Sequence, residues 1–350
     1  MTGNELSRLV KAGEFFSGED FSGTDCKNAD LSGGIFSEVN FDDCDFSGAN
    51  LKQATFNSCS MKNCRFAGAD LKDANLVKSV LSGALFEGTL LDTAKFIEAD
   101  LTGAVFTGAT MSTALVNDSC LADSSFEEAV LETTLFNSCD LKLAVFKNAT
   151  MRTAIFYECG FDENDFTGSV INLCCFQSAV LSNVNFSNMD LAQCQFIECE
   201  LTGCDFSKAK LKQGGFRNAA LKDSVFDDAD LELANFYEAN LEASSLKKAN
   251  LEKASMQKAV ITRADLSGAN LHMAQLAEAT AELSNFADAD LTYTDLSHAD
   301  LSQANFSRAG LFRANLHEVN EEKTLWAGSS KSLALGTDKK RQKAEQWGKE

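Results

Sequence analysis

Apolar residues recur at every fifth position along most of the chain. Between Phe16 and Leu316 this spacing samples 61 positions, and 59 of them hold Leu, Phe, Met, Ile or Val. The residue two places earlier is usually small, as in the pentad Ala49-Asn50-Leu51-Lys52-Gln53. A helix places its apolar residues about 3.6 positions apart and a strand about 2 apart, so a strict period of five fits neither. The pattern predicts a backbone that turns once in every five residues.

This unit resembles the A(D/N)LXX motif of the pentapeptide-repeat family, and the resemblance covers about 300 of the 350 residues. The resemblance implies an all-β fold, a right-handed four-sided β-helix with one pentad on each side and 20 residues in each coil. The large and the small residue of each pentad are then expected to point inward. The 61 pentads correspond to about 15 coils.

The distribution of phenylalanine supports a coil with four sides. Of the 27 Phe residues, 25 occupy the large inward position, and sorting them by number modulo 20 places 10, 3, 12 and 0 on successive sides. Phe is therefore expected to line two opposite sides and Leu the other two. This alternation fills a narrow core at the density that protein interiors require.

The ends of a stacked solenoid need caps, because each coil buries its interior only against its neighbours. Residues 1–15 are expected to form an N-terminal cap with a short helix, for which Asn4 is a candidate N-cap. Residues 16–320 are expected to form the β-helix. Residues 321–350 are expected to form a C-terminal cap that includes Trp326, followed by a flexible basic tail.

Charge and hydropathy narrow the choice of location and partner. The net charge of −20 disfavours nucleic acid and anionic membrane surfaces, because both would repel the chain. No run of residues approaches the roughly 18 apolar residues of a membrane helix, and the first residues lack the apolar segment of a signal peptide. A cytoplasmic protein that binds neither membranes nor nucleic acid directly is expected.

The cysteines and histidines favour structural roles over catalysis. Nine of the 12 cysteines occupy the small inward position, where a free thiol behaves as a small apolar residue. His272, His298 and His317 fall at outward positions and are expected to be solvated, without a carboxylate or cysteine to complete a ligand set or a triad. The sequence therefore predicts no catalytic residue, no cofactor and no metal, and the chain is not expected to be an enzyme. The nine cysteines are Cys44, Cys59, Cys64, Cys139, Cys159, Cys174, Cys194, Cys199 and Cys204.

Two surface features are candidates for a binding site. Glu158, Glu198 and Glu238 fall on one side at every second coil, which predicts an acidic surface. The outward position before the large residue is often aliphatic between residues 80 and 180. Such contiguous apolar surface on a soluble protein often marks a contact site. Leu115, Leu135 and Ile155 are expected to stack on one side, next to a neutral column that includes Thr113 and Thr133.

These features predict a non-enzymatic binding or scaffold protein that presents an acidic rod surface to a protein partner, and a homodimer is a further possibility. The family that the chain resembles includes members that mimic DNA and bind type II topoisomerases, protecting them from quinolones. A DNA-mimicking topoisomerase binder is therefore one alternative. An accessory or adaptor protein of a bacterial secretion or toxin system is the other.

Overall fold

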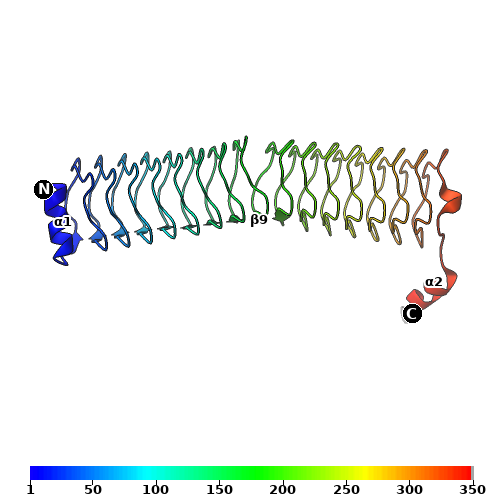
Figure 1. The fold of residues 1–350 in the computed structure, drawn as a ribbon. Coiled ribbons are helices and arrows are strands. Elements are labelled where there is room, and N and C mark those ends of the chain that lie inside the picture. The colour runs from blue at the N-terminus through cyan, green and yellow to red at the C-terminus, as the bar shows by residue number, and fades with distance from the viewer. Residues whose placement is uncertain (348–350) are drawn as a thin grey trace. The chain divides into compact units, whose positions relative to one another are not determined.

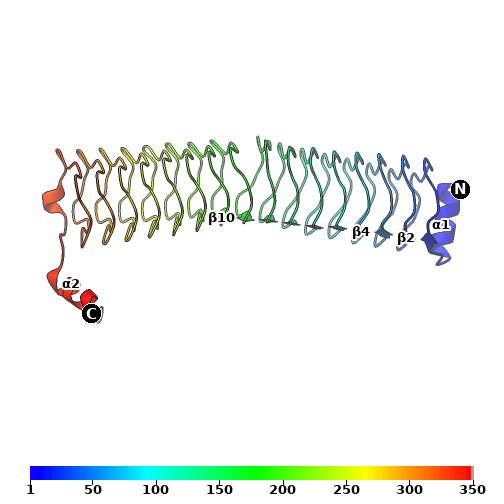
Figure 2. The same ribbon diagram turned by 180° about the vertical axis from the view of Figure 1, so that it is seen from behind.

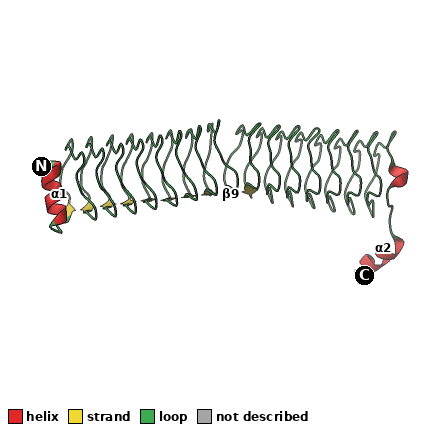
Figure 3. Cartoon of the chain, viewed as in Figure 1, coloured by secondary structure: helices red, strands yellow, loops and turns green. Residues whose placement is uncertain are grey.

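The structure is a computed structural model that describes residues 1–347. The chain divides into two compact units, Met1–Val180 and Leu181–Glu350. Residues 348–350, at the end of the expected basic tail, lie outside the described residues. In each unit the backbone winds in stacked coils (Figure 1). Turns and loops, more than regular strands, make up most of each coil (Figure 3).

One pentad forms one side of a coil, as the pentad around Leu51 shows. Ala49 and Leu51 are buried, and the outward Asn50 between them pairs in parallel with the residues 20 positions before and after it. The Oδ1 atom of Asn50 accepts the Lys52 N–H at 3.3 Å. Gln53 then takes a left-handed φ of 58°, which directs the chain into the next side. The Asp or Asn of the motif is therefore a turn-forming residue.

The first unit contains a parallel sheet on one side of its coils. Each strand pairs with the next at a register of 20 residues, so that Phe36 lies between Phe16 and Phe56. Single parallel bridges at the same register hold the other three sides. The strands are β1 (Phe16–Ser17), β2 (Ile35–Ser37), β3 (Thr55–Asn57), β4 (Asn75–Val77), β5 (Lys95–Ile97), β6 (Leu115–Asn117), β7 (Leu135–Asn137), β8 (Ile155–Tyr157) and β9 (Cys175–Gln177).

The second unit keeps the same register with the strand β10 (Gln195–Ile197) and with single bridges from Asn185↔Asp205 to Asn315↔Leu335. The predicted solenoid class is confirmed, with a short helix near each end of the described chain. The predicted count of about 15 coils differs from the about nine turns that stacked strands define. The pentad period gives the number of sides in the solenoid, and four sides make one coil. It does not report which sides contain regular strands, so the sequence could not predict where the regular strands stop.

Stacked phenylalanine rings fill the core of the first unit, as the modulo-20 distribution predicts. Phe126 and Phe146 stack with their ring centroids 5.0 Å apart and their planes within 3°. Phe136 and Phe156 form the opposite stack, also at 5.0 Å. The two stacks meet edge to face, with Phe126 and Phe136 at 5.9 Å and 87°. Both arrangements are favoured by the quadrupole of aromatic rings.

Helix α1 (Gly3–Lys11) closes the first coil of the first unit (Figure 2). Thr2, rather than Asn4, is its N-cap, and Thr2 and Glu5 form a reciprocal capping box. Leu6 is buried against the coil. A side chain at Gly3 would approach the backbone of the first coil too closely, because an added Cβ would lie 2.6 Å from the Asp25 carbonyl oxygen. Glycine therefore lets the helix dock at close range.

The end of the second unit is capped by an indole ring and two short helices. Trp326 stacks on Phe306 with the ring centroids 4.7 Å apart. A 3-10 helix, η1 (Lys331–Leu333), follows, and then the helix α2 (Lys339–Gln346), whose N-cap is Asp338. No described side chain of α2 is buried. Polar contacts must therefore position this helix.

Candidate functional site

The aliphatic ladder, defined as Leu115, Leu135 and Ile155, lies on three consecutive strands of the first unit. Parallel pairing places Leu115 beside Leu135 and Leu135 beside Ile155. The three side chains point outward, and Ile155 is 39% exposed. The stacking that the sequence predicted for these residues is therefore present.

A second apolar column lies on the preceding side of the same coils. Val130 and Val170 alternate with Thr110 and Thr150 in a continuous series of parallel bridges. Val170 is 36% exposed, and Leu173, in the turn that follows it, is 47% exposed. The two columns together form a largely uncharged surface on the first unit.

A threonine column occupies the turn between these two sides. Thr93, Thr113, Thr133 and Thr153 all have left-handed backbone, with φ between 58° and 62°. Within residues 1–347 these four are the only β-branched residues in that conformation. A β-branched side chain is strained there, since its Cβ substituents crowd the backbone. The hydroxyl of Thr113 offsets part of this cost by donating to the Ser112 carbonyl oxygen at 2.6 Å.

The three glutamates of the predicted acidic surface occupy equivalent left-handed turns, with Glu158 in the first unit and Glu198 and Glu238 in the second. Glu158 accepts a hydrogen bond from the Ser138 hydroxyl at 3.5 Å. Glu238 forms an ion pair with Lys258 at 3.8 Å. Basic residues thus occur at the same turn position and compensate part of the negative charge.

An aromatic stripe that the sequence analysis did not identify lies on the second unit. It consists of Met273, Tyr293, Phe312 and Arg313, and its first three side chains are each between 45% and 47% exposed. The rings of Tyr293 and Phe312 meet edge to face at 5.7 Å, and the Arg313 guanidinium lies 5.7 Å from the Tyr293 ring centroid. The sequence contains a pattern that could have predicted this stripe. Met273, Tyr293 and Arg313 are spaced 20 residues apart, at a turn position that is usually polar.

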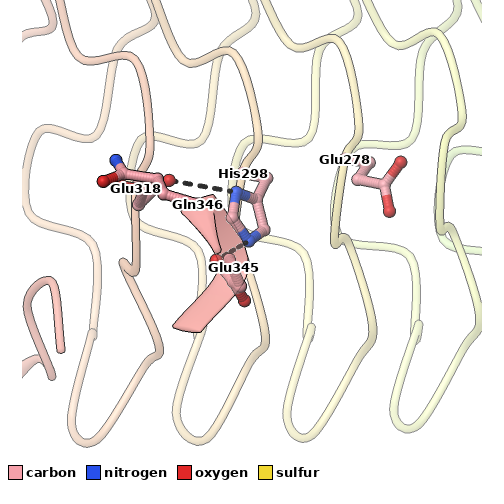
Figure 4. A pocket seen from close by; sticks show the side chains of 5 residues that line it. All are labelled: Glu278, His298, Glu318, Glu345 and Gln346. Atoms are coloured by element: carbon pink, nitrogen blue, oxygen red, sulfur yellow. Dashed lines mark ion pairs between the residues drawn. The ribbon is translucent and has the colours of Figure 1, made fainter. Parts of the chain in front are cut away.

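A histidine cluster, defined as His298, His317 and Glu345, connects α2 to the last coils of the second unit. Figure 4 shows the contact of Glu345 with His298. The Glu345 Oε2 atom lies 3.1 Å from His317 Nε2 and 3.3 Å from His298 Nε2. His317 is only 1% exposed, so the expectation that it is solvated is wrong. The sequence also offered no carboxylate partner for the histidines, because Glu345 reaches them only when the tail folds back.

Hydrogen bonds fix both sides of this cluster. The Asp338 N–H donates to His317 Nδ1 at 3.0 Å, and Arg341 Nε donates to Glu345 Oε1 at 2.6 Å. The hydrogen bonds from Arg341 and His317 lower the pKa of Glu345 to about 2. The carboxylate is therefore ionised at neutral pH. The surface hollow beside the cluster is lined by Glu278, His298, Glu318, Glu345 and Gln346.

No helix among residues 1–347 is both long and apolar enough to cross a membrane.

Comparisons with known proteins agree with the repeat pattern. The family model described as "Pentapeptide repeat region" matches residues 15–86 and 170–246. The model described as "Pentapeptide repeats (8 copies)" matches residues 74–112, 244–280 and 284–320. No curated protein is significantly similar in sequence to this chain.

Three solved structures illustrate the similarity. A trypsin-treated variant of QnrB1, a plasmid-mediated fluoroquinolone resistance protein, is 24% identical over 57% of this chain and 87% of its own, with a TM-score of 0.31. HetL from Nostoc sp. strain PCC 7120 is 23% identical over 72% and 91%, with a TM-score of 0.20. Rfr23 from Cyanothece 51142 is 21% identical over 47% and 89%, with a TM-score of 0.20. The family models and the register of 20 residues establish that this chain belongs to the pentapeptide repeat family.

Proposed function

We propose that this chain is a non-catalytic scaffold that binds a protein partner through the aliphatic ladder and the threonine column of its first unit. The observation that carries the proposal is the threonine column, in which Thr93, Thr113, Thr133 and Thr153 all keep left-handed backbone. Strained residues persist where the surrounding structure or a function maintains them. Glycine, asparagine or aspartate would fill the same turns at lower cost, as they do elsewhere in the chain.

The ladder supplies the apolar contact area for such a partner. Leu115, Leu135 and Ile155 align along the stacking direction, and the uncharged Thr113 and Thr133 lie in the turn that leads to the ladder. Apolar burial favours association without requiring a matching charge. This surface therefore suits a partner with its own apolar, uncharged contact face.

A partner that binds the acidic side, such as a type II topoisomerase, is the competing proposal. Two observations disfavour it: Lys78 lies 3.6 Å from Glu98, and Lys258 lies 3.8 Å from Glu238. Ion pairs of this kind reduce the field that would attract a basic partner. An adaptor of a secretion or toxin system is compatible with either surface.

Two triple variants distinguish the surfaces. The serine variant carries Leu115→Ser, Leu135→Ser and Ile155→Ser. The glutamine variant carries Glu158→Gln, Glu198→Gln and Glu238→Gln. Affinity capture of the partner from the source cells is compared for the wild type and these two variants. The proposal expects the serine variant to lose the partner and the glutamine variant to retain it. Raising the salt concentration from about 0.1 M to 0.5 M is expected to have little effect on capture of the partner by the wild type. Salt screens attraction between charges, and the proposed contact is apolar.

A second measurement distinguishes loss of partner binding from misfolding of the variant. The serine variant must keep the far-UV circular dichroism spectrum and the urea midpoint of the wild type to within a small shift, since its substitutions are at outward positions. Sedimentation velocity of both variants reports whether the partner is a second copy of the chain. The competing proposal expects that only the glutamine variant loses the partner. It also expects that the wild type inhibits supercoiling by a type II topoisomerase or protects that enzyme from a quinolone. These two results together would establish the acidic surface as the binding site instead.

A further inference from the structure

We propose that His298, His317 and Glu345 form a binding site for a divalent transition metal of the zinc class, which fastens α2 to the last coils of the second unit. The three residues converge from three separate segments of that unit, namely two successive turns of the solenoid and the tail helix. Figure 4 shows two of them, His298 and Glu345. This inference is independent of the proposed scaffold function.

The spacing of the ligand atoms fits a tetrahedral metal. Zinc binds imidazole nitrogen and carboxylate oxygen at about 2.0–2.2 Å, and two ligands of a tetrahedral ion at that distance lie about 3.3–3.5 Å apart. Glu345 Oε2 lies 3.3 Å from His298 Nε2 and 3.1 Å from His317 Nε2. The two imidazole rings are nearly perpendicular, at 87°, with their centroids 5.2 Å apart. Small side-chain adjustments therefore bring all three atoms to an ion.

The residues around the cluster resemble the outer shell of a metal site. A ligating histidine usually offers its other ring nitrogen to a carboxylate, and His298 Nδ1 lies 3.8 Å from Glu318 Oε2. Arg341 holds the second oxygen of the Glu345 carboxylate. His317 is buried, which limits its rotation. The hollow beside His298 leaves room for water as a fourth ligand.

Metal binding must change one hydrogen bond. The Asp338 N–H donates to His317 Nδ1, so the proton of the neutral metal-free ring lies on Nε2, toward Glu345. A metal can take the Nε2 lone pair only in the other tautomer, so the single ring proton moves from Nε2 to Nδ1 and the ring stays neutral. Nδ1–H would then face the Asp338 N–H, so the first turn of α2 has to shift. The site thereby couples metal binding to the position of the tail.

The tail is suited to such a connection. Helix α2 has eight residues and buries no described side chain, and a helix of that length is marginal by itself in water. Its described contacts with the solenoid include Glu345 and Asp338, and both are made to the two histidines. A coordinated ion would therefore order a helix that packing alone does not hold.

The test is titration of the full-length reduced protein with zinc sulfate in competition with a chromophoric chelator. The expected stoichiometry is one zinc per chain, and His298→Gln and Glu345→Gln are each expected to weaken binding by roughly tenfold or more. Both residues are at least partly exposed, so these variants should fold. His272→Gln is the matched control, because His272 contacts Tyr293 and lies outside the cluster. Its affinity should equal that of the wild type.

A second readout does not depend on affinity. Trypsin cleavage at Lys339, Lys340 and Arg341, followed by mass spectrometry, is expected to slow severalfold when zinc is present in the wild type and in His272→Gln. It should not slow in Glu345→Gln. Absence of stoichiometric binding, or zinc binding that both cluster variants retain, would overturn the proposal and leave Glu345 as a hydrogen-bonded tether only. Binding without protection of the tail would refute the fastening role.

Discussion

Thr133 and Thr153 lie on neighbouring coils with their hydroxyl oxygens 3.1 Å apart, although both have left-handed backbone. The hydrogen bond between them partly offsets a conformation that L-residues with branched Cβ atoms avoid. The threonine column therefore lowers the stability of the fold. We expect that a function, such as binding a partner, maintains it.

Replacing Thr133 with Asn is expected to stabilise the first unit by up to about 1 kcal/mol, because asparagine tolerates left-handed backbone better. The loss of the Thr153 hydrogen bond reduces this gain. Urea denaturation measures it. Thr150→Asn is the matched control, since Thr150 is a bridge residue outside the left-handed set and should show no gain. A Thr133 variant less stable than the wild type would argue against strain at this turn.

Phe146→Ala is expected to reduce the free energy of unfolding by about 3 to 5 kcal/mol, since it leaves a cavity between fixed rings. Phe146 is fully buried and stacks on Phe126 at 5.0 Å and on Phe166 at 5.2 Å. Those neighbours belong to adjacent coils whose spacing the backbone bridges hold. Chemical denaturation provides the measurement, and a midpoint equal to that of the wild type would contradict the packing described above.

Thiol labelling of the native protein is expected to follow burial. Burial raises the pKa of the Cys204 thiol to about 12, so very little thiolate exists at neutral pH. Cys120 and Cys175 are only partly buried and should react first with an aromatic disulfide reagent. The remaining cysteines should react only after denaturant is added. Mass spectrometry of the labelled peptides assigns the sites, and early modification of Cys204 would be the contrary result.

The contribution of Asp30 to the N-terminal cap is expected to depend on pH. The hydrogen bond and charge of Lys11, 2.9 Å away, lower the pKa of the Asp30 carboxyl below its ordinary value. A lowered folded-state pKa gives stability that is present above the ordinary pKa of about 3.9 and lost as the pH falls through the folded-state value. Asp30→Asn should therefore cost up to about 1 kcal/mol at pH 7, as exposed pairs do.

As the pH falls below the ordinary Asp pKa, the stabilities of the Asp30→Asn variant and the wild type should converge. Thermal melts at several pH values between 2 and 7 measure this convergence. A difference between the two proteins that stays constant over that range would mean that the carboxylate charge does not contribute.

The repeat made most of the fold predictable, while the parts outside it were not. The period assigned Phe126 and Phe146 to one stack, since residues 20 apart must face the same neighbours. Glu345 carries no such constraint, because its place depends on how a non-repeating tail folds back. The polar contacts of His317 with Asp338 and Glu345 depend on the same tail. Thr133 was identified by its column, but its strain is a property of the backbone that the side-chain pattern does not report.

The register of 20 residues also limits how this protein can change in length. Insertion of a single pentad between β3 and β4 would rotate every later side of the first unit by a quarter turn, so that leucine layers would follow phenylalanine layers in the same stack. The aliphatic ladder would stay in line with itself but leave the side it occupies relative to α1. Insertion of four pentads would preserve every alignment. Natural or engineered variants that differ in length are therefore expected to differ by whole coils of 20 residues, because only such insertions keep every side chain stacked on its equivalent in the next coil.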